Sequence, residues 1–149
     1  MSDLTILPVS IASDLGALAL EVRRKVFIVE QNVPETVERD AYDAEAIHLV
    51  AIDGGDVVGT LRIVFLPEHA KFGRVAVLRH ARGKGIASRM MQAGMKIARS
   101  RGENRFYLTS QADKISFYEK LGFVAYGDAF EEAGMPHRAM KTYLTDLQA

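Results

Sequence analysis

The chain has 149 residues, of which 48% are hydrophobic and 26% charged, and its 19 basic and 19 acidic residues cancel to a net charge of zero. This length and composition are typical of a globular protein with one core, so we expect a single domain over residues 1–149. The balanced charge lacks the positive field of a nucleic-acid-binding protein, and the absence of cysteine excludes disulfide scaffolds, thiolate zinc sites and cysteine nucleophiles.

The first half of the chain predicts one long helix and an antiparallel pair of strands. Apolar residues such as Ile11, Leu15 and Leu18 recur every three or four positions, which indicates a helix with one buried face. Gly54-Gly55 stands between two apolar runs and is typical of a hairpin turn. In chain order we expect a strand, a helix, an acidic loop and two strands, at Leu4–Val9, Ile11–Glu30, residues 31–45, Ile47–Asp53 and Asp56–Phe65.

The second half of the chain alternates strands and helices. Ile86, Met90 and Ile97 share one helical face, and Gly122 is placed to end a helix in a left-handed conformation. An antiparallel first half followed by this alternation predicts an α+β fold, an α/β sandwich with a mixed sheet. In chain order we expect a strand, a helix, a strand, a helix and two strands, at Phe72–Leu78, residues 86–101, Asn104–Thr109, Ala112–Leu121, Phe123–Tyr126 and Arg138–Leu144.

The sequence predicts neither a membrane span nor a secretory signal. No apolar run approaches the roughly 18 residues that cross a bilayer. The segment Met1–Leu4 has no basic region followed by an apolar stretch. We therefore expect a cytoplasmic protein with no membrane partner. The oligomeric state is left open between a monomer and a homodimer.

The most informative stretch is Arg82-Gly83-Lys84-Gly85-Ile86-Ala87, between a predicted strand and a predicted helix. A glycine turn at a helix start exposes backbone N–H groups and the positive end of the helix dipole, which together bind anions such as phosphate. The basic residues in and around the stretch indicate a polyphosphate. A Gly-x-Gly turn before a helix is equally often only a tight connection. Neither the P-loop pattern nor the dinucleotide pattern fits, since Ser88 stands in place of the third glycine of the latter.

Two motifs resemble the GNAT acetyltransferase superfamily. The phosphate loop of that family reads Gln/Arg-x-x-Gly-x-Gly/Ala, which Arg82, Gly85 and Ala87 match in register. One helix and one strand later, the run Phe117–Phe123 is similar to the family's late helix. The resemblance implies a mixed central sheet of about six to seven strands flanked by about four helices. Further residues resemble the bacterial ElaA-like branch, namely Val22–Gln31, Asp40, Asp43, His48 and Gly134–His137.

The resemblance implies acetyl-coenzyme A as co-substrate and no metal. The strand before the loop would splay from its neighbour, so that Val75, Ala76 and Val77 face the pantetheine arm and an N–H group there stabilises the thioester oxygen. Gln111 stands where the family often carries asparagine, seven residues before Tyr118, and keeps an amide near the cofactor. The pyrophosphate would be held by the backbone of Arg82, Gly83, Lys84, Gly85, Ile86 and Ala87.

Tyr118 is the residue that the resemblance implies as general acid. Expulsion of coenzyme A leaves a thiolate, and a phenol of pKa about 10 can protonate it or donate a hydrogen bond to it. A packed aromatic residue at a helix end is the plain structural alternative. Because the chain has no cysteine, a thioacyl-enzyme is excluded and we expect direct attack by the acceptor amine within a ternary complex.

The acceptor amine needs a base or a water relay, because an alkylamine is protonated at pH 7. The candidate bases are Glu30, His48 and His137, each of which can equally be a structural residue. In the family the acceptor cleft begins after the first helix, which adds Phe27, Gln31 and Arg62 as substrate-binding candidates. Arg62 can instead pair with an acid of the loop that follows the helix.

Residues 30–45 carry six acids and a single base, Arg39. Such a run is usually a solvated loop, but if it borders the cleft its field favours a cationic acceptor such as a polyamine, an aminoglycoside or a lysine side chain. The spacing of the acids matches no calcium loop. We thus expect a small-molecule or peptide amine as partner. Two alternatives stay open: an acyltransferase similar to acyl-homoserine-lactone synthases, and a non-catalytic sensor that binds acyl-coenzyme A.

Overall fold

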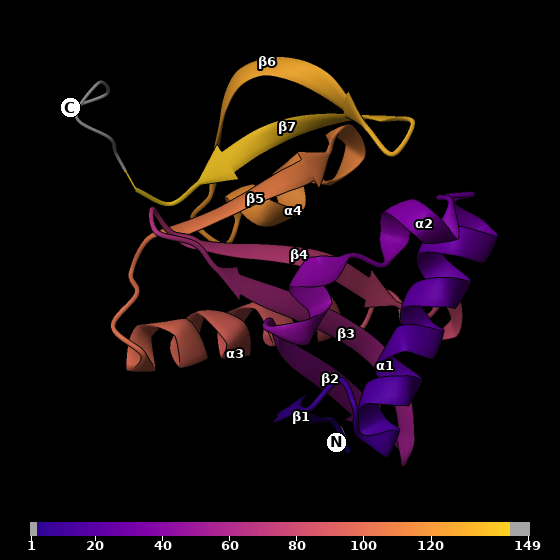
Figure 1. Ribbon diagram of the computed structural model, residues 1–149. Helices are drawn as coiled ribbons and strands as arrows, with labels where there is room; N and C mark the ends of the chain where they lie inside the picture. Colours follow the sequence, from indigo (N-terminus) through magenta and orange to yellow (C-terminus); the bar gives the residue numbers. More distant parts are fainter. Residues whose placement is uncertain (1–2, 144–149) are drawn as a thin grey trace.

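A seven-stranded sheet forms the centre of the molecule, in the order β1-β2-β3-β4-β5-β7-β6 (Figure 1). Neighbouring strands are antiparallel except for β4 and β5, which are parallel. The expected mixed sheet is therefore confirmed. The computed structural model describes residues 3–143. Its strands are β1 (Thr5–Val9), β2 (Ile47–Asp53), β3 (Asp56–Phe65), β4 (Ala70–Val77), β5 (Phe106–Gln111), β6 (Val124–Glu132) and β7 (Met135–Lys141).

Helices cover both faces of the sheet, as expected for an α/β sandwich (Figure 1). One face of β2, β3 and β4 packs on α3 and the opposite face on α1, while α4 contacts β5 and β6. No helix in the described part of the chain is long and apolar enough to cross a membrane. The helices are α1 (Asp14–Arg23), α2 (Glu35–Glu38), α3 (Ile86–Ser100) and α4 (Ile115–Glu119), with a π-helical segment η1 (Arg24–Glu30) and 3-10 turns η2 (Ala41–Ala44), η3 (Arg79–Ala81) and η4 (Ala112–Lys114).

The first helix differs from the expected span Ile11–Glu30. The Ser13 hydroxyl accepts a hydrogen bond from the N–H group of Gly16 at 3.0 Å, so α1 begins after this cap. At Arg24 the chain changes to wider π-helical turns, which end at Gln31. A period of three to four residues does not reveal such a change. The acidic loop likewise contains α2 and η2, which are too short to show a period.

The last hairpin is longer than the sequence indicated. Its first strand continues far beyond the expected span Phe123–Tyr126, to a tight turn at Ala133-Gly134 with φ values of 50° and 77°. A register shift after Tyr126 and mostly exposed side chains conceal the alternation of this strand. Leu144, the expected end of the last strand, lies outside the described residues.

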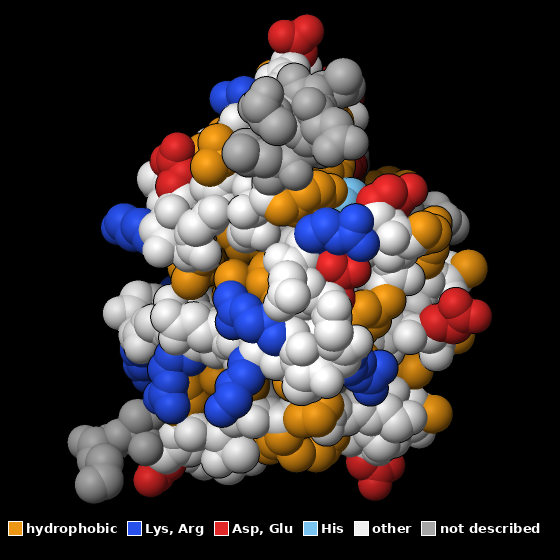
Figure 2. All heavy atoms as spheres, turned by 90° about the vertical axis from the view of Figure 1, so that its left-hand side faces the viewer, with side chains coloured by type: hydrophobic (Ala, Val, Ile, Leu, Met, Phe, Trp, Pro, Cys, Tyr) orange, Lys and Arg blue, Asp and Glu red, His pale blue; other side chains and the backbone are white. Residues whose placement is uncertain are grey.

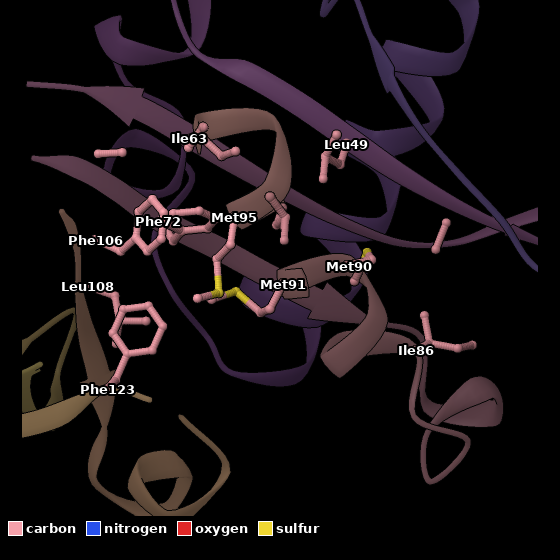
Figure 3. Packing of buried hydrophobic residues seen from close by; sticks show 14 of the residues in the cluster. Leu49, Ile63, Phe72, Ile86, Met90, Met91, Met95, Phe106, Leu108 and Phe123 are labelled. Atoms are coloured by element: carbon pink, nitrogen blue, oxygen red, sulfur yellow. The ribbon is translucent and has the colours of Figure 1, made fainter. Parts of the chain in front are cut away.

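The main core lies between α3 and the sheet (Figure 3). Met90 and Met95 of α3 are buried there with Ile63 and Phe72 of β3 and β4. The helix lies close to the sheet at Gly94, where an added Cβ would lie 2.8 Å from the Phe72 ring. Glycine at this position therefore sets the distance between helix and sheet.

The parallel strands β4 and β5 separate after a short paired segment. They pair only at Ala70 with Phe106 and at Lys71 with Tyr107, and both strands then continue apart (Figure 1). Beyond this segment, the edge of β4 that faces β5 pairs with no other strand of residues 3–143. This is the splay expected before the glycine loop, and it places a gap in the middle of the sheet.

The opposite side of the molecule, where β4 and β5 pair, faces the viewer in Figure 2. Basic side chains gather in its lower part, at the height of α3, and acidic side chains lie mostly toward its edges. Arg99 and Arg101, at the end of α3, lie over the rings of Phe106 and Phe65 at 5.3 and 5.6 Å. These cations therefore cover apolar rings and complement the negative end of the helix dipole.

Gly94→Val tests the close approach of α3 to the sheet. The added side chain overlaps Phe72 and Ile63 in a packed core, so the free energy of unfolding should fall by about 1–3 kcal/mol or more. Gln92→Val, on the exposed face of the same helix, is the control and should cost little. Urea denaturation measures both, and equal stability of the two variants would contradict this packing.

Candidate active site

A cavity of about 1020 Å³ lies in the gap between β4 and β5. It is lined by residues 72–77 of β4 and 108–111 of β5, by η1 on one side and by the β6–β7 turn on the other. Most of the residues singled out in the sequence meet here. They are Phe27, Glu30, Gln31, Arg62, Val75, Ala76, Val77, Arg82, Gly83, Gly85, Ile86, Ala87, Gln111, Tyr118 and His137.

The glycine loop opens one end of the cavity onto the start of α3. Gly83 and Gly85 both have φ of 79°, a conformation that favours glycine, and an added Cβ at either would meet open space. No side chain caps the first turn of α3, so the N–H groups of residues 86–88 face the cavity without a partner from residues 3–143. This end of the cavity is therefore suited to an anion.

Lys84 is the one loop residue that does not line the cavity. Its Nζ lies 3.7 Å from Asp53 at the end of β2, and its side chain is exposed. The sequence suggested Lys84 because of its charge, but the turn directs this charge to the β2–β3 hairpin. Its backbone remains part of the loop.

A bulge in β4 presents backbone groups to the gap. Arg74 and Val75 lie opposite the single residue Leu61, and Arg74 has φ of 52°. The N–H group of Leu78 bonds to β3, so by alternation the peptide groups of Val77 face the gap. The bulge and the splay together leave N–H groups of β4 available to a ligand.

Tyr118 lines the cavity from α4. Its ring packs edge-on against Phe117 and Phe123, with ring centres 4.9 and 6.1 Å apart. Its hydroxyl makes no hydrogen bond to the described residues, and burial raises the pKa of Tyr118 above its ordinary value of 10. The phenol therefore stays protonated at neutral pH and has a hydrogen bond to donate.

Glu30 and Arg82 form a clamp between η1 and the glycine loop. Both carboxylate oxygens of Glu30 accept from the guanidinium of Arg82 at 2.8 Å, while the Arg82 Nε donates to the Val77 carbonyl at 2.8 Å. The hydrogen bonds from Arg82 hold the pKa of Glu30 below its usual range. Glu30 thus fixes the loop and does not stand free as a base.

A second link crosses the gap itself. The Gln111 side chain, at the end of β5, donates to the Gln31 side chain, at the end of η1, at 3.0 Å. Gln111 was expected to face a cofactor, and the structure places its amide against the other wall of the cavity instead. The π-helical turns bring Gln31 and Phe27 to this wall.

The acids of the loop after η1 are held by arginines. Glu38 and Asp43 both bind Arg23 at 2.7 Å, and Asp40 and Asp43 bind Arg62 at 2.6 and 2.9 Å. Arg74 completes the set, at 3.3 Å from Glu38. The expected pairing of Arg62 with a loop acid is confirmed. Arginines from α1, β3 and β4 pair with three of the six acids of this run, so its acidic field is weaker than the sequence alone suggests.

This network depends on ionised carboxylates. Burial alone would raise the pKa of Asp43, but hydrogen bonds and charges from Arg23 and Arg62 outweigh it and hold the pKa well below its usual range. The Arg62 hydrogen bonds likewise lower the pKa of Asp40. Because these folded-state pKa values lie below those of free carboxyls, the stabilisation is present above about pH 4 and is lost as the pH falls below it.

The two histidines considered as bases lie in different places. His48 is buried on β2, does not line the cavity, and has its Nε2 2.8 Å from the Asp43 carbonyl oxygen. Burial lowers the pKa of His48. Because β3 and β4 stand between β2 and the gap, His48 does not reach the cavity and instead holds the acidic loop through Asp43. His137 lines the cavity from β7.

The sequence did not single out Glu132. Its carboxylate lies 3.6 Å from the Nε2 atom of His137 and 3.2 Å from the Thr109 hydroxyl. A signal was present, because Ala133-Gly134 marks a tight turn that brings its two flanks together. Within residues 3–143, no three His, Asp or Glu side chains gather as a metal site requires.

Comparisons with known proteins agree on one family. Residues 18–123 match the acetyltransferase (GNAT) family. The uncharacterized N-acetyltransferase YjcF of Bacillus subtilis is 36% identical over 123 residues, which cover 82% of this chain and 88% of that relative. A putative N-acetyltransferase from Lactobacillus plantarum superposes with a TM-score of 0.84 at 26% identity over 93% of this chain and 96% of the other. Escherichia coli ElaA superposes with a TM-score of 0.81 at 27% identity, covering 96% and 100% of the two chains. The likeness to ElaA is therefore confirmed.

Arg23→Met tests the ion-pair network. The change leaves Glu38 and Asp43 without their main partner, so the free energy of unfolding at pH 7 should fall by about 3–5 kcal/mol. Arg24→Met is the matched control, since the neighbouring Arg24 forms an exposed pair with Glu21 that should contribute little. A small and equal effect of both changes in urea denaturation would contradict a structural role of the network.

Proposed function

This chain belongs to the GNAT acetyltransferase family, and we propose that it transfers an acetyl group from acetyl-coenzyme A to a primary amine. The observation that carries the proposal is one continuous cavity that joins the uncapped start of α3 to the open edge of β4. An anion site beside an extended slot fits a molecule with a pyrophosphate and a long amide-bearing arm. The family match supports the same assignment.

The cofactor would be held by backbone groups. N–H groups of residues 83–88 would bind the pyrophosphate, helped by the dipole of α3. The N–H groups of β4 at Val75 and Val77 would pair with the pantetheine arm, while the Val77 carbonyl stays bonded to Arg82. The thioester supplies an activated acetyl group. An N–H group of β4 directed at its carbonyl oxygen would stabilise developing negative charge by roughly 3–4 kcal/mol.

Tyr118 would stabilise the departing sulfur. An alkyl thiol has a pKa of about 8.5, so complete proton transfer from a phenol whose pKa is raised above 10 is uphill by at least about 2 kcal/mol. A hydrogen bond from the Tyr118 hydroxyl to the thiolate carries no such penalty. We therefore assign Tyr118 as a hydrogen-bond donor to the leaving group.

The acceptor would enter between η1 and the β6–β7 turn. Phe27 and Gln31 line one wall of this half of the cavity and His137 the other. Of the three candidate bases, His137 alone combines access to the cavity with a side chain that is not held by an arginine. We assign His137 as the group that takes the proton of the amine, with direct attack in a ternary complex because the chain has no cysteine.

Gly85→Glu tests the anion site. Acetyl-coenzyme A at one hundred times its dissociation constant should stabilise the wild-type protein by about 2.7 kcal/mol and raise its melting temperature. A glutamate at the loop should abolish this rise through bulk and negative charge. Gly102→Glu is the control, because Gly102 also has positive φ and open space but lies at the far end of α3. An unchanged rise in Gly85→Glu would remove the loop from the site.

Tyr118→Phe tests the hydrogen bond to sulfur. Loss of a hydrogen bond to a charged group should lower kcat about 10- to 100-fold, while the Kd of acetyl-coenzyme A stays within about twofold. Tyr126→Phe, outside the cavity, should keep full turnover. Release of free thiol from coenzyme A during turnover with an amine measures kcat. Wild-type turnover in Tyr118→Phe would exclude this role.

A further inference from the structure

We infer that Glu132 and His137 form a binding site for the ammonium group of the acceptor, so that the acceptor is a cationic alkylamine. The inference rests on the proposed function and specifies its substrate class. Its basis is a pair of proton acceptors that face each other across the cavity wall with no donor between them.

The turn between β6 and β7 fixes the position of this pair. Ala133 and Gly134 both have positive φ, which makes a tight two-residue turn, and Glu132 and His137 stand on its two flanks. The tip of this hairpin lies on the same side of the sheet as α2, beyond the diverging ends of β4 and β5 (Figure 1). Both residues line the acceptor half of the cavity.

Hydrogen bonding settles which ring nitrogen of His137 is free. The Nδ1 atom lies 2.9 Å from the Met135 carbonyl oxygen, which only accepts, so Nδ1 carries the hydrogen. In the neutral ring, Nε2 then presents a lone pair. That lone pair faces the Glu132 carboxylate at 3.6 Å, and a second N–H donor between the two would satisfy both.

Glu132 has capacity left for such a donor. Its carboxylate accepts only from the Thr109 hydroxyl, at 3.2 Å, among the described residues, and no lysine or arginine pairs with it. Three other carboxylates on the cavity wall are held by arginines, namely Glu30, Glu38 and Asp40. Asp113 also lines the cavity, from η4 before α4.

The ion pairs on the cavity wall leave Glu132 without a paired cation from the described part of the chain. The three arginines and three acids of the loop network cancel. Lys71 and Lys114 also line the cavity, but neither forms an ion pair with Glu132; the Lys71 ammonium group lies over the Tyr107 ring, 5.9 Å from the ring centre. Glu132 therefore offers a carboxylate that pairs with no lysine or arginine among the described residues and lies next to His137.

The pair would both bind and activate the amine. An alkylammonium placed between them gives one proton to Nε2, and the carboxylate stabilises the resulting imidazolium. The free amine then attacks the thioester carbonyl carbon, a C–N bond forms and the C–S bond breaks. The second amine proton ends on the sulfur as the thiol of coenzyme A, and His137 returns its proton to water.

Glu132→Gln separates this site from the rest of the cavity. With 1,4-diaminobutane as acceptor, the variant should lose about 10- to 100-fold in kcat/KM, mostly through KM. With aniline, which is neutral at pH 7, the loss should stay within about threefold. Glu131→Gln is the matched control, because Glu131 is exposed on the same strand and its side chain forms no hydrogen bond or ion pair with the described residues. Equal losses with both amines, or none with either, would overturn the ammonium site while leaving the acetyltransferase assignment intact.

Direct binding tests the site without catalysis. With coenzyme A present, the ¹⁵N signal of His137 Nε2 should shift on addition of 1,4-diaminobutane in the wild type and in Glu131→Gln, but not in Glu132→Gln. A wild-type signal that does not move would overturn the inference whether or not the protein transfers acetyl groups. Absence of transfer to every amine, with the signal still shifting, would contradict the proposed function alone.

Discussion

The divergence of β4 from β5 is the constraint on which the rest of the site depends. Two residue pairs hold β4 and β5 together, and beyond these pairs the sheet is open at its centre. A buried strand edge without partners is costly, so an opening of this kind is sustained by what occupies or clamps it. The Glu30–Arg82 pair and the Gln31–Gln111 bond span the opening from the η1 side. The cavity between them is where a donor and an acceptor can meet.

Ion pairs build the acceptor side of this opening. Three arginines from the sheet and α1 hold the loop after η1 in place. The three arginines and three acids of this network balance, so the network itself carries no net charge. In the proposed site, the β6–β7 turn on the opposite wall recognises the charge of the acceptor, because Glu132 has no arginine or lysine partner among the described residues. The charges that hold the loop in place and the charge proposed to bind the acceptor thus lie on opposite walls of the cavity.

Local features of the sequence predicted the fold and the donor end of the site, whereas distant contacts decided the rest. Gly83, Gly85 and Tyr118 lie in short motifs whose geometry follows from neighbouring residues, and all three line the cavity. The partners of Arg23 and Arg62 lie about 15 to 22 residues away in the sequence, so spacing could not reveal that the loop acids are neutralised. The position of His48 could not be predicted either. Alternation along the strand gives the face on which its side chain lies, but not the distance of that strand from the gap.

Amide hydrogen exchange tests the central claim most directly, because the account assigns the cofactor to backbone N–H groups. Saturating coenzyme A should slow exchange at residues 75–77 of β4 and 83–88 of the loop and first turn of α3. The amides of β1 and β2, far from the gap, should exchange at an unchanged rate. Unaltered exchange at residues 75–77 and 83–88, under conditions where coenzyme A is bound, would contradict the account.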